Sequence, residues 1–331
     1  MDTRKQPSRF LAILLCVCMV LTMLPAGSIT AFAAGEETVI SSDTTWEAQA
    51  ISNDVRIESG ATLTINGQII INDEVTISGG GTIARGDGAA YFNIGSGVSL
   101  TLDGVTVDGE AAPTDETAAV YTAHDIVYYE AGRDFTYGEG TEADEHTTEE
   151  AAAHTVVHIT QPGTYAVSGT LSAGQIAVDL GEDAEDDQSA VVTLILNGVD
   201  ITCTVAPAVI FYSVYECGST DVETASPTVD TTAAGINVVL ADGSENTFTG
   251  SHVARIYEEG TTDKLHKYDG AFYSKMSMNI GGEAEGTGEL HITADNEGLD
   301  SELHLTINGG VINIRAQNDG INTNEDGVSV T

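Results

Sequence analysis

Residues 302–322 read ELHLTINGGVINIRAQNDGIN, and this stretch decides between two β folds that are open to the chain. Apolar and polar residues alternate from Leu303 to Ile307, two glycines interrupt, the alternation resumes, and Asn-Asp-Gly ends it. Successive side chains of a strand point to opposite faces of a sheet, so alternation predicts strands. The stretch is therefore a strand-turn-strand unit, either of a β-sandwich or of one coil in a longer stack.

The same apolar positions recur earlier in the chain, in phase with this stretch. Leu290, Ile292 and Ala294 align with Ile312, Ile314 and Ala316. After a one-residue turn insertion, Met276, Met278 and Ile280 align with Leu303, Leu305 and Ile307. Hairpins do not require such phasing, whereas stacked coils do, because each inward side chain lies on its equivalent in the next coil. We therefore predict an all-β solenoid, a parallel β-helix with coils of about 22 residues. Its predicted core includes Leu303, Leu305, Ile307, Ile312 and Ile314.

Glycines mark where the coils turn. Gly270, Gly298 and Gly320 are taken as equivalent corner positions, and the first interval is six residues longer than the second. The sequence GGEAEGTG between the first two glycines supplies a corner that can absorb these extra residues. Acidic insertions at 181–190 and 216–235 fit the same architecture, because only the strands of a coil must stack.

Residues 1–33 have the order of a secretory signal peptide. The basic residues of MDTRKQPSR precede the apolar run FLAILLCVCMVLTML, and an Ala-Phe-Ala triplet ends at Ala33. This run is shorter than the roughly 20 apolar residues of a membrane helix. We predict that residues 1–33 are removed and that the protein is secreted or displayed at the cell surface. A retained membrane anchor is the alternative.

The charge of the chain excludes several classes of partner. The formal net charge is −40, and residues 1–33 hold three basic residues and one acidic residue, so their removal leaves about −42. Such a chain repels nucleic acid and anionic membranes. It also repels acidic substrates unless a divalent cation bridges the two. Bound cations would relieve the self-repulsion of the chain, which makes Ca²⁺ the expected cofactor.

Changes of pattern divide the mature chain into three segments. Alternating runs fill residues 34–110, an acidic stretch at 111–153 is predicted to be a linker or insertion, and alternation returns from 154 to 331. Two cysteines follow the signal, Cys203 and Cys217. Export permits a disulfide, and the sequence leaves open whether the two pair.

From His158 onward, a succession of motifs resembles one protein family. HITQPGTYAVSGTLSAGQIAVDL, VVTLILNGVDITCTVAPAVIF, INVVLADGSENTFTG, DGAFYSK, GLDSELHLTINGG and NDGIN follow in order, within roughly Val156 to Thr331. They resemble the bacterial extracellular carbohydrate-binding-domain-containing proteins. The resemblance implies a right-handed parallel β-helix like that of pectate lyases, with Ca²⁺ held on the helix. It also implies binding of cellulose-like or pectin-like plant cell-wall polysaccharide. Family members carry further coils after the NDGI corner, so we expect the chain to be truncated.

A column of acidic side chains is the candidate calcium site. Asp269, Glu297 and Asp319 each precede a corner glycine, and equivalent residues of stacked strands lie about 4.8 Å apart. Carboxylates this close raise one another's pKa, whereas Ca²⁺ prefers a set of about six to eight oxygen ligands. Three neighbouring residues complete the predicted ligands: Asp295, Asp300 and Asp326. The alternative is that Asn/Asp-Gly only supplies turn geometry.

Aromatic and basic residues near the first of these corners are the candidate sugar-binding residues. Sugars are usually held by aromatic faces and a few polar groups. The candidates are Tyr268, Phe272, Tyr273, Lys275 and Arg315. The alternative is that the rings cover the edge of a coil.

These patterns together predict a secreted, non-catalytic, monomeric protein that binds plant cell-wall polysaccharide with the help of Ca²⁺. A Ca²⁺-dependent polysaccharide lyase is the first alternative, with Arg315 as a candidate base. No recognisable catalytic motif surrounds the basic residues of 154–331. A structural surface protein or adhesin is the second alternative.

Overall fold

The computed structural model describes residues 37–46, 49–51, 53–65, 69–71, 76–85, 98–219, 226, 229, 231–283 and 285–323. The predicted signal peptide and Asp326 lie outside these residues. The described residues form strands and turns with almost no helix, so the prediction of an all-β protein is confirmed. Within them, no helix has the length and apolar character that a membrane crossing requires. The chain divides into two compact units between Gly95 and Ser96.

The first unit is built from short strands that pair in parallel. They are β1 (Thr38–Ile40), β2 (Thr44–Trp46), β3 (Gln49–Ile51), β4 (Val55–Ile57), β5 (Thr62–Ile65), β6 (Ile69–Ile71), β7 (Ile77–Gly79) and β8 (Thr82–Arg85). The sheet orders are β1-β4-β7, β2-β5-β8 and β3-β6. Trp46 and Leu63 lie in a small core that these strands enclose.

The second unit begins with β9 (Val98–Thr101), β10 (Thr106–Val107), β11 (Glu110–Ala111), β12 (Val120–Ala123), α2 (Thr148–Ala152), β13 (Thr155–Ile159), β14 (Gly163–Leu171), β15 (Gly174–Asp179), η1 (Glu182–Asp186), β16 (Val192–Thr202) and β17 (Val209–Ser213). It continues with η2 (Thr231–Ala233), β18 (Ile236–Leu240), β19 (Glu245–Gly250), β20 (Val253–Tyr257), β21 (Lys264–Tyr268), β22 (Gly270–Ser274), β23 (Met278–Gly282), β24 (Glu289–Ala294), β25 (Glu297–Ser301), β26 (Leu305–Ile307), β27 (Val311–Arg315) and β28 (Ile321–Thr323).

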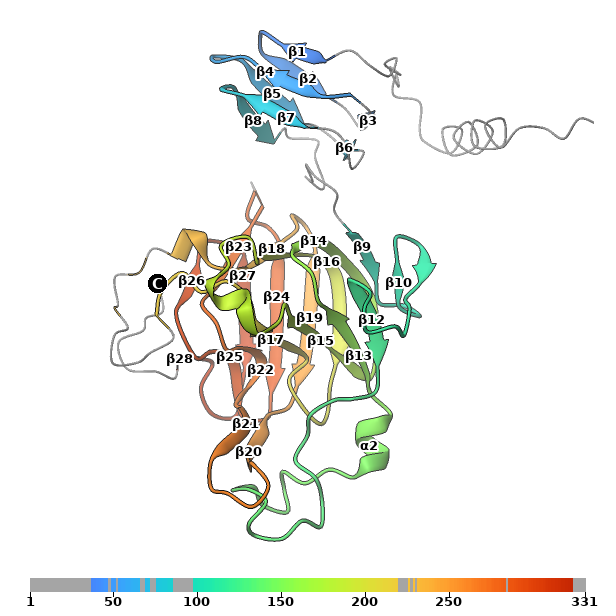
Figure 1. The fold of residues 1–331 in the computed structure, drawn as a ribbon, viewed down its shortest axis with the longest axis vertical. Coiled ribbons are helices and arrows are strands. Elements are labelled where there is room, and N and C mark those ends of the chain that lie inside the picture. The colour runs from blue at the N-terminus through green and yellow to red at the C-terminus, as the bar shows by residue number, and fades with distance from the viewer. Residues whose placement is uncertain are drawn as a thin grey trace, which may run out of the picture. The chain divides into compact units, whose positions relative to one another are not determined.

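Most strand pairs of the second unit are parallel and join segments that are distant in sequence (Figure 1). One sheet has the order β12-β13-β15-β17-β22-β25-β28, in which β12–β13 is the antiparallel pair. A larger sheet runs β11-β10-β9-β14-β16-β18-β23-β26, with β19, β24 and β27 following from β16. The strands β20 and β21 pair antiparallel as a separate hairpin. The consecutive strands β22, β23 and β24 therefore pair, in the same order, with β25, β26 and β27.

The in-phase pattern predicted from the sequence is confirmed by the strand pairing. Leu290 lies opposite Ile312, and Met278 lies opposite Leu305. The predicted equivalence of Gly298 and Gly320 agrees with the register of β25 and β28, but Gly270 is displaced by one residue, because it pairs with Glu297. Residues of β22 and β23 pair with partners that lie further along the chain than the partners of β24 residues do. The difference in sequence separation is five residues. The GGEAEGTG corner thus absorbs five extra residues rather than six.

The core of the second unit contains the apolar residues of these strands. Leu303 and Leu305 are buried, while Ile307, Ile312 and Ile314 are partly buried and pack against the core. Fully burying a side chain of this size contributes about 1.5–3 kcal/mol, so the paired apolar columns hold the strands together.

Residues 111–153 form an insertion that packs on the second unit. Its strand β12 pairs with β13, and its residues Ile126 and Tyr129 are buried in the core. Thr147 and Glu150 make a capping box at the start of α2. The preceding strand β9 pairs with β14, so the second unit begins before the expected boundary at residue 110.

The two cysteines of the second unit are free thiols. Cys203 is buried, Cys217 is half-buried, and no disulfide joins them. Burial raises the pKa of each thiol to about 11. Protonated thiols are poor nucleophiles, so neither side chain is set up for cysteine catalysis.

Candidate functional site

Three aromatic side chains that the sequence suggested for sugar stacking lie in the core. Tyr268, Phe272 and Tyr273 are 2%, 0% and 1% exposed. The ring of Phe272 packs between those of Phe211 and Phe248, with centroid distances of 6.0 and 5.4 Å. The ring of Tyr273 packs against Tyr268 of β21 at 5.2 Å. The structure therefore does not present these rings for sugar stacking, because Phe272 packs among core rings and Tyr273 is covered by Tyr268 and Lys267 of β21.

The two basic candidates lie in different places. Lys275 is half-buried after β22, and its charge adds to burial in lowering the pKa of His266. Arg315 is exposed at the end of β27, opposite Thr293 of β24. Lys275 therefore lies near His266, in the antiparallel hairpin that β20 and β21 form.

A cleft of about 770 Å³ lies between the insertion and this hairpin. Its volume is in the range of small-molecule sites. Three kinds of side chain line it: the aromatic residues Tyr128, Tyr137 and Tyr257, the aliphatic residues Ile126, Val127, Ile256 and Leu265, and the charged residues Glu130, Arg133, Asp134, Glu258 and Glu259. Leu265 is 48% exposed. Phe135, which follows the lining residue Asp134 in sequence, is 91% exposed.

The cleft exists because the insertion docks edge-on against β20. Gly138 forms an antiparallel bridge with Ile256. The amide of Glu139 donates to the carbonyl of Arg255 at 2.9 Å, and the amide of Tyr257 donates to that of Tyr137 at 2.8 Å. A Cβ atom on Gly138 would lie 2.0 Å from the carbonyl oxygen of Arg255, so glycine permits this approach.

One wall of the cleft is organised around Arg133. Its guanidinium pairs with Glu130 at 2.6 Å and lies over the ring of Tyr137, 4.9 Å from the centroid. The ring of Tyr137 also contacts that of Tyr129 at 5.3 Å. These contacts fix an aromatic side chain beside carboxylates. The carboxylates of this wall can accept hydrogen bonds from the hydroxyl groups of a sugar.

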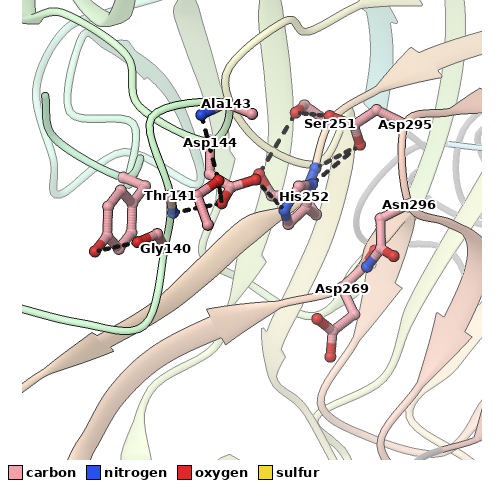
Figure 2. A network of polar contacts seen from close by, with 10 residues as sticks. Gly140, Thr141, Ala143, Asp144, Ser251, His252, Asp269, Asp295 and Asn296 are labelled. Carbon is pink, nitrogen blue, oxygen red and sulfur yellow. Dashed lines mark hydrogen bonds and ion pairs between the residues drawn. The ribbon is translucent and has the colours of Figure 1, made fainter.

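A second set of contacts ties the insertion to the strand corners (Figure 2). His252 lies between two carboxylates, with Nε2 3.2 Å from Asp144 and Nδ1 3.3 Å from Asp295. The hydrogen bond to Asp295 raises the pKa of His252, although burial lowers it. The carboxylate of Asp295 also accepts from the hydroxyl of Ser251 at 2.5 Å. Asp295, a predicted metal ligand, is thus engaged in holding the insertion.

The predicted column of carboxylates is only partly aligned. Because Gly270 pairs with Glu297, Asp269 comes one residue earlier than predicted, and its carboxylate pairs with Lys267 at 2.5 Å. Glu297 accepts from the amide of Asn322 at 3.0 Å. Burial, followed by the charges of Asp269 and Asp319, raises the pKa of Glu297. Three carboxylates therefore influence one another at this corner.

The remaining predicted ligand of the described chain, Asp300, is fully buried on β25. It lies opposite Asn322, as the predicted register requires. In the part of the chain that the structure describes, no three or more His, Cys, Asp or Glu side chains converge as a metal-binding group. Asp326 lies outside that part.

Sequence reasoning missed Tyr128, Arg133 and Tyr137, because it treated residues 111–153 as an acidic connection. A signal was present in the segment VYYEAGRDFTY at 127–137. Its aromatic density is unusual for a solvated linker, which is typically poor in such residues.

The fold is that of an all-β protein with mostly parallel sheets, and its cleft is rich in tyrosine and carboxylate side chains. A family model for carbohydrate-binding domain-containing proteins matches residues 153–331, more than half of the chain, and the chain belongs to this family. A carbohydrate-binding domain-containing protein of Acetivibrio thermocellus is 32% identical over 162 residues. The match covers 48% of this chain and 45% of that protein, so the chain spans less than half of this relative's length. No solved structure matches the chain.

Proposed function

We propose that the protein is secreted and binds plant cell-wall polysaccharide, without cleaving it, in the cleft between the insertion and the β20–β21 hairpin. The observation that carries the proposal is the lining of this cleft, which combines three tyrosines with hydrogen-bonding carboxylates. Membership in a family named for carbohydrate binding supports it.

The binding would use the side chains in two ways. Tyr257 supplies apolar surface that holds a sugar ring with little loss of conformational entropy, because its hydroxyl is fixed by a hydrogen bond to Glu139. Tyr137 positions Arg133 in the wall of the cleft. Glu258 and Glu259 are exposed and can accept hydrogen bonds from hydroxyl groups. The cleft is open to solvent on this side, as a site for a polymer requires.

We also propose that the second unit is a right-handed parallel β-helix. Support comes from the parallel pairing of β22, β23 and β24 with β25, β26 and β27 in the same order. A monomer fits this proposal, because a binding site built from one chain needs no second copy.

Calcium is proposed at the corner formed by Glu297, Asp319 and Asn322. Their carboxylate and amide oxygens are ligands that Ca²⁺ prefers. The raised pKa of Glu297 is consistent with negative charge that a cation would offset. Asp269 and Asp295 fit less well, because Lys267 and His252 already neutralise them. A bound ion would stabilise the corner by neutralising its charge.

The calcium proposal is tested by titrating the protein with Ca²⁺ in a calorimeter and by melting it with and without EDTA. Asp319→Asn should lower Ca²⁺ affinity at least about tenfold and reduce the effect of EDTA on Tm. The matched control is Asp183→Asn, which removes an exposed carboxylate from η1. Equal Ca²⁺ binding by both variants would refute the assignment to this corner.

Polysaccharide binding is tested by pull-down on insoluble cellulose and on pectin, each with and without EDTA. We expect the protein to be retained on at least one of them. Retention should be lost in Tyr137→Ala and kept in Tyr121→Ala, whose ring stacks on His158 away from the cleft lining. If no polysaccharide retains the protein in any condition, the proposed function is wrong. Release of unsaturated sugars from pectin would instead favour the lyase alternative.

A further inference from the structure

We propose that the cleft selects uncharged polysaccharide and rejects polyuronate. This inference rests on the proposed function and adds the chemical class of the ligand. Three observations support it: the charges that line the cleft, the contacts of Arg133, and the segment of the chain that forms one wall.

The lining of the cleft carries a clear excess of negative charge. One guanidinium, that of Arg133, faces four carboxylates, which are those of Glu130, Asp134, Glu258 and Glu259. The other titratable base among the described lining residues is His266, whose pKa is lowered by burial, so it is neutral at pH 7. A uronate residue would bring a further negative charge beside these groups, and like charges at close range disfavour binding.

Arg133 is already paired with a carboxylate of the cleft, so its charge offsets only one of the four. Both its Nε and its Nη2 contact the same oxygen of Glu130, at 2.7 and 2.6 Å. Its guanidinium carbon lies over the ring of Tyr137. Turning toward a ligand would break both interactions and leave Glu130 uncompensated.

An uncharged sugar avoids these costs and uses the same groups. Its hydroxyl groups can donate hydrogen bonds to the carboxylates of Glu258 and Glu259, and an uncharged sugar adds no further negative charge to the cleft. Its C–H faces can pack on Tyr257 and on the exposed side chain of Leu265, while Tyr137 holds Arg133 in the wall of the cleft. The cleft therefore suits a neutral polymer such as a glucan, and its charge acts against an acidic one.

One wall of the cleft lies outside the residues that the family model matches. The family match begins at residue 153, whereas one side of the cleft is formed by residues 126–137. Both Arg133 and the aromatic side chain that it covers come from that side. The insertion thus adds a specificity-determining wall to a fold shared with relatives.

The experiment compares cellohexaose with hexagalacturonate by calorimetry at pH 7, in the presence of EDTA so that no divalent cation bridges the uronates. We expect cellohexaose to bind at least about tenfold more tightly at low salt, with the ratio shrinking as salt is added. Glu258→Gln combined with Glu259→Gln should lower the ratio of the affinity for cellohexaose to that for hexagalacturonate at least about threefold. The control pair, Glu182→Gln with Asp183→Asn in η1, removes as much charge elsewhere and should leave the ratio unchanged.

The outcomes separate this inference from the function on which it rests. Equal or tighter binding of hexagalacturonate in EDTA would overturn the inference while leaving carbohydrate binding intact. A ratio that responds equally to both pairs of substitutions would also overturn it, because the discrimination would then come from the charge of the whole chain. Failure to bind any polysaccharide, in the pull-down above, would instead refute the proposed function.

Discussion

The docking of the insertion on β20 predicts a large local effect of Gly138→Ala. The new Cβ would lie 2.0 Å from the carbonyl oxygen of Arg255, and ordinary contact begins at 3.4 Å, so the two backbones must separate by more than an ångström. That shift disrupts the hydrogen bonds donated by Glu139 and Tyr257. At about 1 kcal/mol each, the insertion should lose about 2 kcal/mol, which raises its local opening about 30-fold.

Hydrogen exchange measures this opening directly. The amides of Glu139 and Tyr257 should exchange about 30-fold faster in Gly138→Ala, while those of β24 and β27 should be unaffected. Gly281→Ala is the matched control, because a Cβ there meets its nearest neighbour, Asn308, at 3.8 Å. If Gly138→Ala exchanges within about threefold of the wild type at both amides, the docking inferred for the insertion is refuted.

Two further predictions concern stability. Phe272→Ala removes a fully buried ring from between two others and should lower the free energy of unfolding by about 3–5 kcal/mol in urea titrations, whereas Phe135→Ala, at a 91% exposed position, should change it by less than about 0.5 kcal/mol. Similar losses in both would contradict the assigned core. Burial raises the pKa of Tyr165 to about 12 from 10.0, so the unfolded state loses this proton first and stability should fall as pH rises between those values. Tyr165→Phe should weaken that alkaline loss in Tm measurements; an unchanged pH profile would show that this hydroxyl contributes nothing.

The sequence predicted the strand pairing well where apolar residues repeat in phase. Leu290 and Ile312 are paired as expected because stacking demands apolar equivalence at buried positions. The error at Gly270 arose because identical residues were taken as equivalent positions. A corner glycine is selected by local backbone and packing, and Gly298, for example, lies so close to Ile314 that a Cβ would meet its side chain at 2.3 Å. Identical residues at corners therefore do not determine the register between strands, whereas the alternation of buried apolar residues along a strand does.

The candidate site was less predictable, because it depends on contacts between segments distant in sequence. Alternation along β22 indicates which side chains share a face, but it does not reveal that β21 covers one of those faces and buries Tyr273. The cleft likewise depends on a backbone hydrogen bond between Tyr137 and Tyr257, two residues that lie far apart in the sequence. Nothing in the local composition of either segment specifies that contact.

The central claim is that sugar binds between the insertion and the β20–β21 hairpin, and hydrogen exchange with and without cellohexaose tests it most directly. Protection on ligand binding should concentrate in residues 126–137 and 256–266, which line the cleft. Tyr137→Ala should abolish that protection. Protection confined to β24 and β27 around Arg315, with none in these two segments, would contradict the claim.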